Sequence, residues 1–248
     1  MSSSTSGKVA LISGAAGVMG RAVVEAMLED GIRVIMVDLA EQRLQEMAER
    51  YGKAAIPLVL DITDPQTVSS RVARLEEETG GVDILVNNAG ILSNNKSETT
   101  EPEEWRRVLQ VNLDGMFYLC RAVIPQMKRK RWGRIVNVSS LAAKTGGITA
   151  GTAYSVSKGG VTSLTFSLAA ETAAFGITVN AIAPAYVRTP MITEQLTEEQ
   201  RRGLLAKIPV GRFCEPEEFA HAVRFLVSPL SGFITGELLD MNGGLLFD

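Results

Sequence analysis

The chain has 248 residues, 46 % of them hydrophobic, and a formal net charge of −3 at pH 7. It is long enough and apolar enough to bury a core, which excludes an intrinsically disordered protein. The negative charge and the lack of a wide basic face argue against nucleic-acid binding, and no apolar stretch is long enough to cross a bilayer. We therefore expect neither nucleic acid nor a membrane as a partner.

Short apolar runs alternate along the chain with stretches of helical periodicity. The runs that we expect to be strands are, in order, Val9–Ile12, Arg33–Val37, Ile56–Leu60, Ile84–Val86, Ile135–Val138, Ile177–Ile182 and Glu237–Met241. The stretches that we expect to be helices are Arg21–Asp30, Gln42–Tyr51, Thr67–Glu78, Glu103–Met127, Tyr154–Phe175 and Glu217–Val227. Strands with few polar positions are buried on both faces, and their alternation with helices implies right-handed parallel crossovers. The pattern predicts a single doubly wound (Rossmann) α/β domain, with a seven-stranded parallel sheet and helices on both faces.

The chain shows no repeat, linker or internal domain boundary. Residues 1–7 are rich in serine and lack the apolar core of a signal peptide, so we expect a flexible tail before a domain at 8–248. The segment near 190–212 interrupts the alternation, and we expect it to form a substrate lobe or lid.

Cysteine and histidine are too few for a disulfide framework or a zinc centre. Two cysteines, Cys120 and Cys214, suit a reducing compartment, and we expect a cytoplasmic protein. Cys120 falls on the apolar side of a helical pattern and is expected in the core. His221 lies in an ordinary helical pattern and is expected to be a surface or packing residue, so we predict no metal site. The cations at 128–131 follow an expected helix, where they complement its dipole.

A glycine-rich turn, Ser13-Gly14-Ala15-Ala16-Gly17-Val18-Met19-Gly20, follows the first strand and opens a helix. Small residues there let the backbone approach a pyrophosphate, and the helix N-terminus supplies N–H donors. Asp38 ends the second strand, where a carboxylate can accept hydrogen bonds from ribose hydroxyls and repel a 2′-phosphate. The alternatives are a plain tight turn and a helix cap. Together the two features favour a dinucleotide site for NAD.

The segment Tyr154-Ser155-Val156-Ser157-Lys158 places a phenol and an ammonium one helical turn apart. A free phenol has a pKa of about 10, and a cation about 4 Å away in a partly screened site can lower it toward neutrality. Ser139 and Ser140 end the fifth strand, and ligands of open parallel sheets bind at such strand ends. Ser140 is expected to donate a hydrogen bond to a substrate carbonyl, and its alternative is a turn-forming role.

These motifs occur together, and the chain resembles the short-chain dehydrogenases/reductases over almost its whole length. The further matching elements are Asp61-Ile62, Asn87-Asn88-Ala89-Gly90, Asn112, Asn180-Ala181-Ile182-Ala183-Pro184, Phe233-Ile234-Thr235-Gly236 and Asn242-Gly243-Gly244. Within the family the pattern is most similar to the 3-oxoacyl-acyl-carrier-protein reductases and their metabolic relatives.

The resemblance implies roles for individual residues. Tyr154 is then the general acid or base, Lys158 lowers its pKa and holds the nicotinamide ribose, Ser140 positions the substrate oxygen, and Asn112 holds a water of the proton relay. The residues implied to bind the cofactor are Gly14, Gly17, Met19, Gly20, Asp38, Asp61, Ile62, Asn88, Gly90, Tyr154, Lys158, Val187 and Thr189. Asn87 is expected to tie strands together instead.

Two positions depart from the family pattern. Val18 stands where the family usually has a glycine, and we expect Gly17 to take up part of the turn's conformational demand. Ala185 stands where glycine commonly follows the proline, beside the expected nicotinamide ring.

The resemblance implies an NAD(H)-dependent oxidoreductase that moves a hydride between nicotinamide and a secondary alcohol or its ketone, acting as a dimer or tetramer. Three alternatives remain open: a 3-oxoacyl-acyl-carrier-protein reductase, a non-catalytic dinucleotide-binding regulator, and an epimerase or dehydratase. In the carrier-protein reductases a basic residue precedes the Gly-Ile that opens the sixth strand. Phe175 stands there in this chain, so we expect no strong preference for a carrier-bound substrate.

Overall fold

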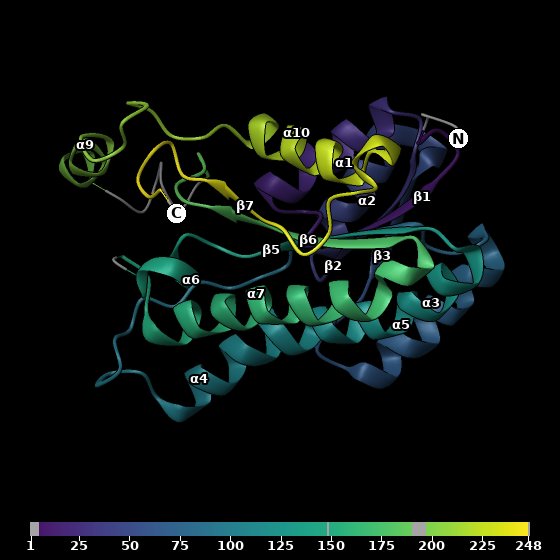
Figure 1. Ribbon diagram of the computed structural model, residues 1–248, viewed down its shortest axis with the longest axis horizontal. Coiled ribbons are helices and arrows are strands. Elements are labelled where there is room, and N and C mark those ends of the chain that lie inside the picture. The colour runs from purple at the N-terminus through teal and green to yellow at the C-terminus, as the bar shows by residue number, and fades with distance from the viewer. Residues whose placement is uncertain (1–4, 148, 190–196, 248) are drawn as a thin grey trace.

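The computed structural model describes residues 5–147, 149–189 and 197–247. Its seven strands form one parallel sheet in the order β3-β2-β1-β4-β5-β6-β7 (Figure 1). The strands are β1 (Val9–Ser13), β2 (Arg33–Asp38), β3 (Ala55–Val59), β4 (Ile84–Asn87), β5 (Gly133–Val138), β6 (Ile177–Pro184) and β7 (Leu238–Met241). The direction of strand addition reverses between β1 and β4, which leaves a crevice outside their carboxyl ends. The predicted doubly wound fold is confirmed.

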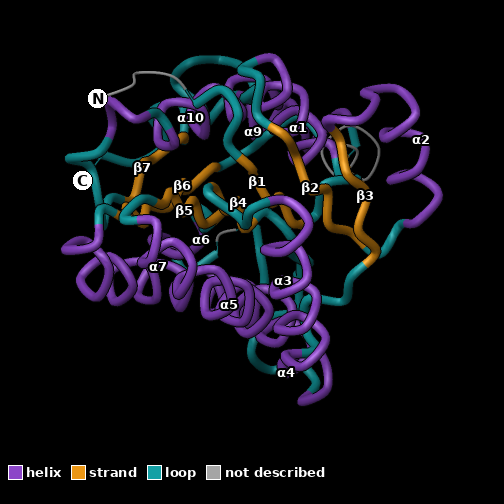
Figure 2. Tube along the Cα trace, turned by 90° about the vertical axis from the view of Figure 1, so that its right-hand side faces the viewer, coloured by secondary structure: helices purple, strands orange, loops and turns teal. Residues whose placement is uncertain are grey.

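Helices cover both faces of the sheet (Figures 1 and 2). Those of the described residues are α1 (Val18–Glu29), α2 (Glu41–Tyr51), α3 (Pro65–Thr79), α4 (Pro102–Leu109), α5 (Gly115–Lys130), α6 (Ala142–Thr145), α7 (Thr152–Thr172), α9 (Glu198–Leu205) and α10 (Pro216–Val227). Helices α1, α2 and α10 lie on one face, and α3, α5 and α7 lie on the other. Single 3-10 turns occur at Gly52–Ala54, Ala173–Phe175 and Pro229–Ser231.

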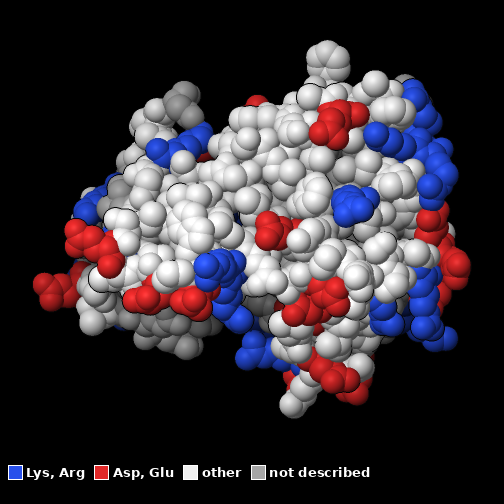
Figure 3. All heavy atoms as spheres, turned by 90° about the horizontal axis from the view of Figure 1, so that it is seen from below, with Lys and Arg blue, Asp and Glu red and all other residues white. Residues whose placement is uncertain are grey.

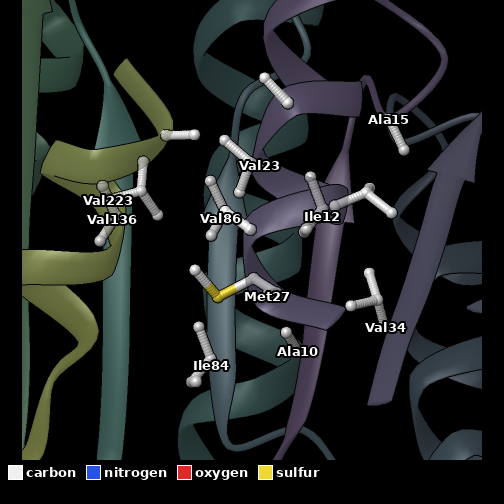
Figure 4. Close-up of a cluster of buried hydrophobic side chains, with 14 of the residues drawn as sticks. Ala10, Ile12, Ala15, Val23, Met27, Val34, Ile84, Val86, Val136 and Val223 are labelled. Atoms are coloured by element: carbon white, nitrogen blue, oxygen red, sulfur yellow. The ribbon is translucent and has the colours of Figure 1, made fainter. Parts of the chain in front are cut away.

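The sheet has a hydrophobic core on each side. In β1, Ala10 and Ile12 pack against α1 and α10, where Met27 is also fully buried (Figure 4). Val9 and Leu11 point to the opposite face and pack against α3, α5 and α7. Because successive side chains of a strand alternate between faces, a strand covered on both sides needs apolar residues at every position. This explains the uninterrupted apolar runs in the sequence.

The predicted long helical stretch over Glu103–Met127 is confirmed, because residues 102–130 are helical without a gap. The structure has α4, then a π-helical segment at Gln110–Asp114, then α5. Asn112 lies in this segment with its side chain fully buried and bonded to the backbone of Ile91. A π-turn adds a residue to the helix without changing its apolar character, so hydrophobic periodicity does not reveal it.

Two expected features lie partly outside the described residues. Of the lobe near 190–212, residues 190–196 are outside, and the rest contains α9, which begins with a capping box of Thr197 and Gln200. Of the expected tail, residues 1–4 are outside, and Gly7 donates a backbone hydrogen bond to Gly31 at 3.0 Å.

His221 lies on the exposed side of α10, as expected. Within the described ranges, every helix is too short or too polar to cross a membrane.

The basic run after α5 has structural partners. The ammonium of Lys128 lies 4.5 Å from the ring centre of Phe175. Arg129 pairs with Glu76 at 2.6 Å, and Lys130 pairs with Asp83 at 2.8 Å. These contacts fasten the end of α5 to its neighbours. Lys128, Arg129 and Lys130 lie in the last turn of α5, where the sequence predicts them.

Candidate active site

A cavity of about 430 Å³ opens at the carboxyl ends of the strands, where the crevice of a doubly wound sheet is expected. It gathers residues that are far apart in the sequence. The predicted site residues that line it are Met19, Asn88, Gly90, Ser140, Tyr154, Lys158, Val187 and Thr189. The residues expected to contact a nicotinamide and those expected to perform proton transfer therefore line the same cavity.

The glycine turn depends on two of its three glycines. Gly14 has a φ of +65°, and a Cβ there would lie 2.8 Å from the Cα of Ala89. A Cβ on Gly20 would overlap the carbonyl oxygen of Gly14. Gly17, by contrast, has φ −75°, which any residue adopts. The expectation that Gly17 meets the conformational demand is wrong, because the positive φ falls on Gly14 and the closest approach on Gly20.

A hydrogen-bond bridge holds this turn to the end of β4. The hydroxyl of Ser13 accepts from the backbone N–H groups of Asn88 and Ala89, each at 3.1 Å. The side-chain amide of Asn88 donates to the carbonyls of Ser13 at 3.1 Å and Gly14 at 3.0 Å. Asn88 therefore shapes the turn from one side while it lines the cavity on the other.

Asp38 holds the turn from the β2 side. One carboxylate oxygen accepts from the backbone N–H of Ala16 at 3.0 Å, and the other accepts from that of Ala40 at 3.1 Å. Each oxygen retains a lone pair for a further donor. A half-exposed negative charge thus lies beside the start of α1.

Asp61 and Ile62 lie beyond β3 and are not among the residues lining the cavity. The Asp61 carboxylate accepts from the backbone N–H of Thr63 at 2.9 Å and from its hydroxyl at 2.7 Å. Ile62 is buried against the start of α5, where a Cβ on Gly115 would lie 2.7 Å from its Cγ1. These residues occupy the same edge of the sheet as the cavity, at its β3 end.

The residues at this edge fit a dinucleotide. The first turn of α1 has no side-chain cap, so its backbone N–H groups are available to a pyrophosphate. The absence of a Cβ at Gly90 leaves room beside two polar groups, because that atom would lie 3.3 Å from Asn112 Oδ1 and 3.5 Å from Lys158 Nζ. Asp38 lies beside the turn that opens α1, and Val187 and Thr189 line the cavity.

Tyr154 and Lys158 project from α7 toward the ends of β4 and β5. The Lys158 ammonium is buried, donates to the carbonyl of Val138 at 2.8 Å and lies 5.6 Å from the Tyr154 ring centre. The hydroxyl of Ser139 donates to the Lys158 carbonyl at 3.0 Å, which ties α7 to the end of β5. Ser140 lies next to this bond and faces the cavity.

Burial dominates the acid–base properties of these groups. It raises the pKa of Tyr154, and a hydrogen bond between the Ser140 and Tyr154 side chains acts in the opposite direction. Burial lowers the pKa of Lys158 to about 8. In this structure burial outweighs the Ser140 hydrogen bond, so the pKa of Tyr154 lies above its ordinary value. The expected lowering of this pKa by Lys158 stays a prediction.

Asn112 is fixed by its side chain. Its Oδ1 accepts from the backbone N–H of Ile91 at 2.8 Å, and its Nδ2 donates to the Ile91 carbonyl and to the Ser157 hydroxyl, each at 3.0 Å. Ser157 in turn donates to the Tyr154 carbonyl at 2.7 Å. Ser157 was not predicted as a site residue, although its place directly before Lys158 is a sequence signal for it.

Two other expectations concern residues of the core. Asn87 donates to Asn137 Oδ1 at 2.8 Å across β4 and β5, which confirms that it ties strands together. Cys120 is fully buried, and burial raises the pKa of its thiol to about 12, so it is a packing residue.

Comparisons with known proteins agree with this geometry. The family model described as enoyl-(acyl carrier protein) reductase matches residues 14–246. The chain is 42 % identical over 240 residues to the 3-oxoacyl-[acyl-carrier-protein] reductase FabG of Vibrio cholerae, covering 96 % of this chain and 97 % of the relative. It is 40 % identical to the protein of the same name from Escherichia coli K12, with the same coverage. For that of Thermotoga maritima the identity is 39 % over 243 residues, which is 97 % of this chain and 98 % of the relative.

Proposed function

The chain belongs to the short-chain dehydrogenase/reductase family, and we propose that it is an NAD(H)-dependent member that interconverts a secondary alcohol and its ketone. The observation that carries the proposal is one cavity lined by Ser140, Tyr154 and Lys158 beside the residues suited to a dinucleotide. The same cavity can hold a small carbonyl compound against the phenol.

In the direction of reduction, a bound nicotinamide supplies the hydride. Ser140 and Tyr154 donate hydrogen bonds to the substrate oxygen, and Tyr154 transfers its proton to that oxygen as negative charge develops there. Lys158, anchored by the Val138 carbonyl, stabilises the resulting phenolate and holds the nicotinamide ribose. In alcohol oxidation the same phenol acts as the base.

Asn112 is proposed to hold a water that returns a proton to Tyr154. Its two side-chain N–H groups already bond Ile91 and Ser157, so this water is proposed to donate to an oxygen of Asn112, either the backbone carbonyl or Oδ1. The π-helical segment around Asn112 supports this role, because such a turn changes the hydrogen-bond pairing of the carbonyls along a helix.

The preference for NAD over NADP is part of the proposal. The Asp38 carboxylate is held at the start of α1 by the N–H of Ala16 and would repel a phosphate on the adenosine ribose. The residues that follow, Leu39, Ala40 and Glu41, offer no cation to receive such a phosphate.

A second candidate function is the reduction of 3-oxoacyl groups on acyl-carrier protein. It is favoured by the relatives of that name at about 40 % identity over nearly the whole chain. It differs from the first candidate in the substrate's carrier and not in the chemistry at Tyr154. A non-catalytic dinucleotide-binding role is less well supported, because the chain retains Ser140, Tyr154 and Lys158 in one cavity.

The test is to follow NADH and NADPH absorbance with a panel of ketones, secondary alcohols and 3-oxoacyl thioesters. We expect net oxidation of NADH by at least one carbonyl compound and its reversal with the product alcohol. Binding of NADH without net turnover across the panel would instead support the regulatory role.

We further propose a dimer or tetramer that works in the cytoplasm. Phe117, Val156 and Phe166 are apolar side chains exposed on α5 and α7 by 40 %, 46 % and 49 %. On the face seen from below in Figure 1, areas of uncharged surface lie between scattered charged side chains (Figure 3). Apolar surface of this kind marks association sites.

The cytoplasmic location is supported by two cysteines that are both free thiols.

A further inference from the structure

Tyr186 lies between two cavities. The first is the candidate active site of about 430 Å³, and the second has a volume of about 330 Å³. Ala185 and Tyr186 line both of them. The second cavity is lined further by the apolar residues Ile208, Val210 and Met241 and by the charged residues Arg212, Glu218 and Asp240.

The backbone around Tyr186 is held on both sides. Ala185 donates to the carbonyl of Met241 at the end of β7 at 3.0 Å. Cys214 donates to the carbonyl of Tyr186 at 3.0 Å, and Arg188 donates to that of Cys214 at 2.8 Å. The position of the Tyr186 Cα is therefore set by strand-like pairing.

The ring of Tyr186 is held in place by packing against another aromatic ring. Its centre lies 6.5 Å from that of Phe213 in an edge-to-face arrangement, which is a favourable geometry for two aromatic rings. Phe213 is buried, and Ile208, Leu204, Leu205 and Leu245 complete the cluster. This packing holds the ring from the side of the lobe.

The Tyr186 hydroxyl lies on the other side of the ring from Phe213, next to the loop between α6 and α7. It lies 3.4 Å from the Thr149 hydroxyl, in the loop between α6 and α7. Lys96 anchors that loop by donating to the carbonyls of Gly147 at 2.7 Å and Ala150 at 2.6 Å. The side chain thus spans from the Phe213 cluster to an anchored loop.

The space in front of Tyr186 is limited. Residues expected to contact the nicotinamide, among them Met19, Val187 and Thr189, line the first cavity, so the substrate receives only part of its volume. Pockets for small ligands span about 300–1,000 Å³. If the two cavities were joined, the substrate would gain the volume of the second cavity, about 330 Å³. Ile208, Val210 and Met241 offer it apolar contacts. The charged residues of that cavity are Arg212 and Glu218, which pair at 2.6 Å, and Asp240, which pairs with Lys144 at 2.6 Å.

We propose that Tyr186 is the residue that sets the length of the substrate, by closing the active-site cavity off from the second one. This inference rests on the proposed function, because it concerns the ketone reduced at Tyr154. Ketones with a short substituent fit in front of the ring. Removal of the ring joins the two cavities and admits long unbranched chains.

The test compares the wild type with Tyr186→Leu, Tyr186→Ala and Tyr186→Phe on linear methyl ketones from butanone to decanone. Leucine keeps an apolar contact with Phe213 and is too short to reach Thr149, so it serves where the alanine variant folds poorly. Phenylalanine is the matched control, since it keeps the ring and loses only the hydroxyl.

We expect the wild type to favour butanone over decanone in kcat/KM by about tenfold or more, the range of discrimination of an apolar pocket. Tyr186→Leu and Tyr186→Ala should reverse this ratio, and Tyr186→Phe should keep it. Decanone should also bind the leucine variant about tenfold more tightly than the wild type in titration calorimetry, a readout independent of turnover. The inference would be overturned if Tyr186→Leu kept the wild-type preference for short ketones. It would also be overturned if Tyr186→Phe reversed that preference as Tyr186→Leu is expected to do. Turnover of butanone by the wild type tests the proposed function separately.

Discussion

The carboxylate of Asp38 accepts a hydrogen bond from the backbone N–H of Ala16 at 3.0 Å, which joins the end of β2 to the turn that opens α1. One charged group thereby shapes the turn and places a negative charge beside it. A phosphate on the adenosine ribose would have to approach this fixed charge, and that cost is the physical reason for the proposed preference for NAD.

We expect the wild type to favour NADH over NADPH by about tenfold or more in kcat/KM, since about 1.4 kcal/mol corresponds to a factor of ten. Asp38→Ser removes the charge and should lower this ratio at least about tenfold. Glu41→Gln is the control, because it removes an exposed charge on the first turn of α2 and should leave the ratio unchanged. A wild type that favours NADPH would contradict the assignment of Asp38.

Tyr154→Phe should lower turnover by about 10² or more, the range of general acid–base catalysis, because we propose the phenol as the proton donor. NADH affinity, measured by fluorescence titration, should change little, since only a hydroxyl is lost. If the variant retained most of its activity, another residue would be the acid.

Lys158 is expected to make stability depend on pH in the alkaline range. Burial lowers its pKa from 10.5 to about 8, so between these values the unfolded chain binds a proton that the folded chain has released. The free energy of unfolding contributed by this group therefore rises with pH from about 8 to 10.5, and the full difference corresponds to roughly 3 kcal/mol.

The measurement is urea unfolding of the wild type and of Lys158→Met across this pH range. The wild type should gain stability relative to the variant as the pH rises, because methionine cannot titrate. Parallel curves for the two proteins would show that the ammonium carries no burial penalty.

Val18 and Gly20 should respond differently to substitution. Val18 is half-buried at the first position of α1, and Val18→Gly should change the Kd for NADH by less than about tenfold while lowering the unfolding free energy by about 1 kcal/mol through backbone entropy. Gly20→Ala should be far more damaging, because its Cβ would overlap the carbonyl oxygen of Gly14. Fluorescence titration and thermal unfolding measure both effects. A large gain in affinity in Val18→Gly would mean that valine obstructs the pyrophosphate.

A carrier-bound substrate should not be strongly preferred. Phe175 stands where the resemblance implies a basic docking residue, and Lys128 lies over its ring while Arg129 is paired with Glu76. We expect kcat/KM for an acyl chain on carrier protein to exceed that on a small thiol by less than about a hundredfold at low salt. Phe175→Arg should increase both the preference and its salt dependence. A larger preference in the wild type that collapses with salt would assign the enzyme to carrier-bound substrates.

Local patterns in the sequence were sufficient to predict the fold and the position of the site. The apolar run Val9–Ile12 predicts a strand covered on both faces, and its core packs on both sides of the sheet. The glycine turn and the Tyr154–Lys158 spacing are also local signals, because each depends on residues within one or two helical turns. Their meeting at one edge of the sheet follows from parallel strands, whose carboxyl ends share an edge.

The tertiary structure decided what depends on contacts between distant residues. The hydrogen bond from Asn112 to Ser157 joins residues 45 positions apart, and the buried Asn112 lies in a π-helical segment that hydrophobic periodicity does not distinguish from an α-helix. The overlap at Gly20 involves the carbonyl of Gly14, and the place of Tyr186 between two cavities depends on Phe213 and Thr149. Sequence patterns describe the neighbours of a residue along the chain, whereas steric overlap, burial and cavity shape depend on its neighbours in space.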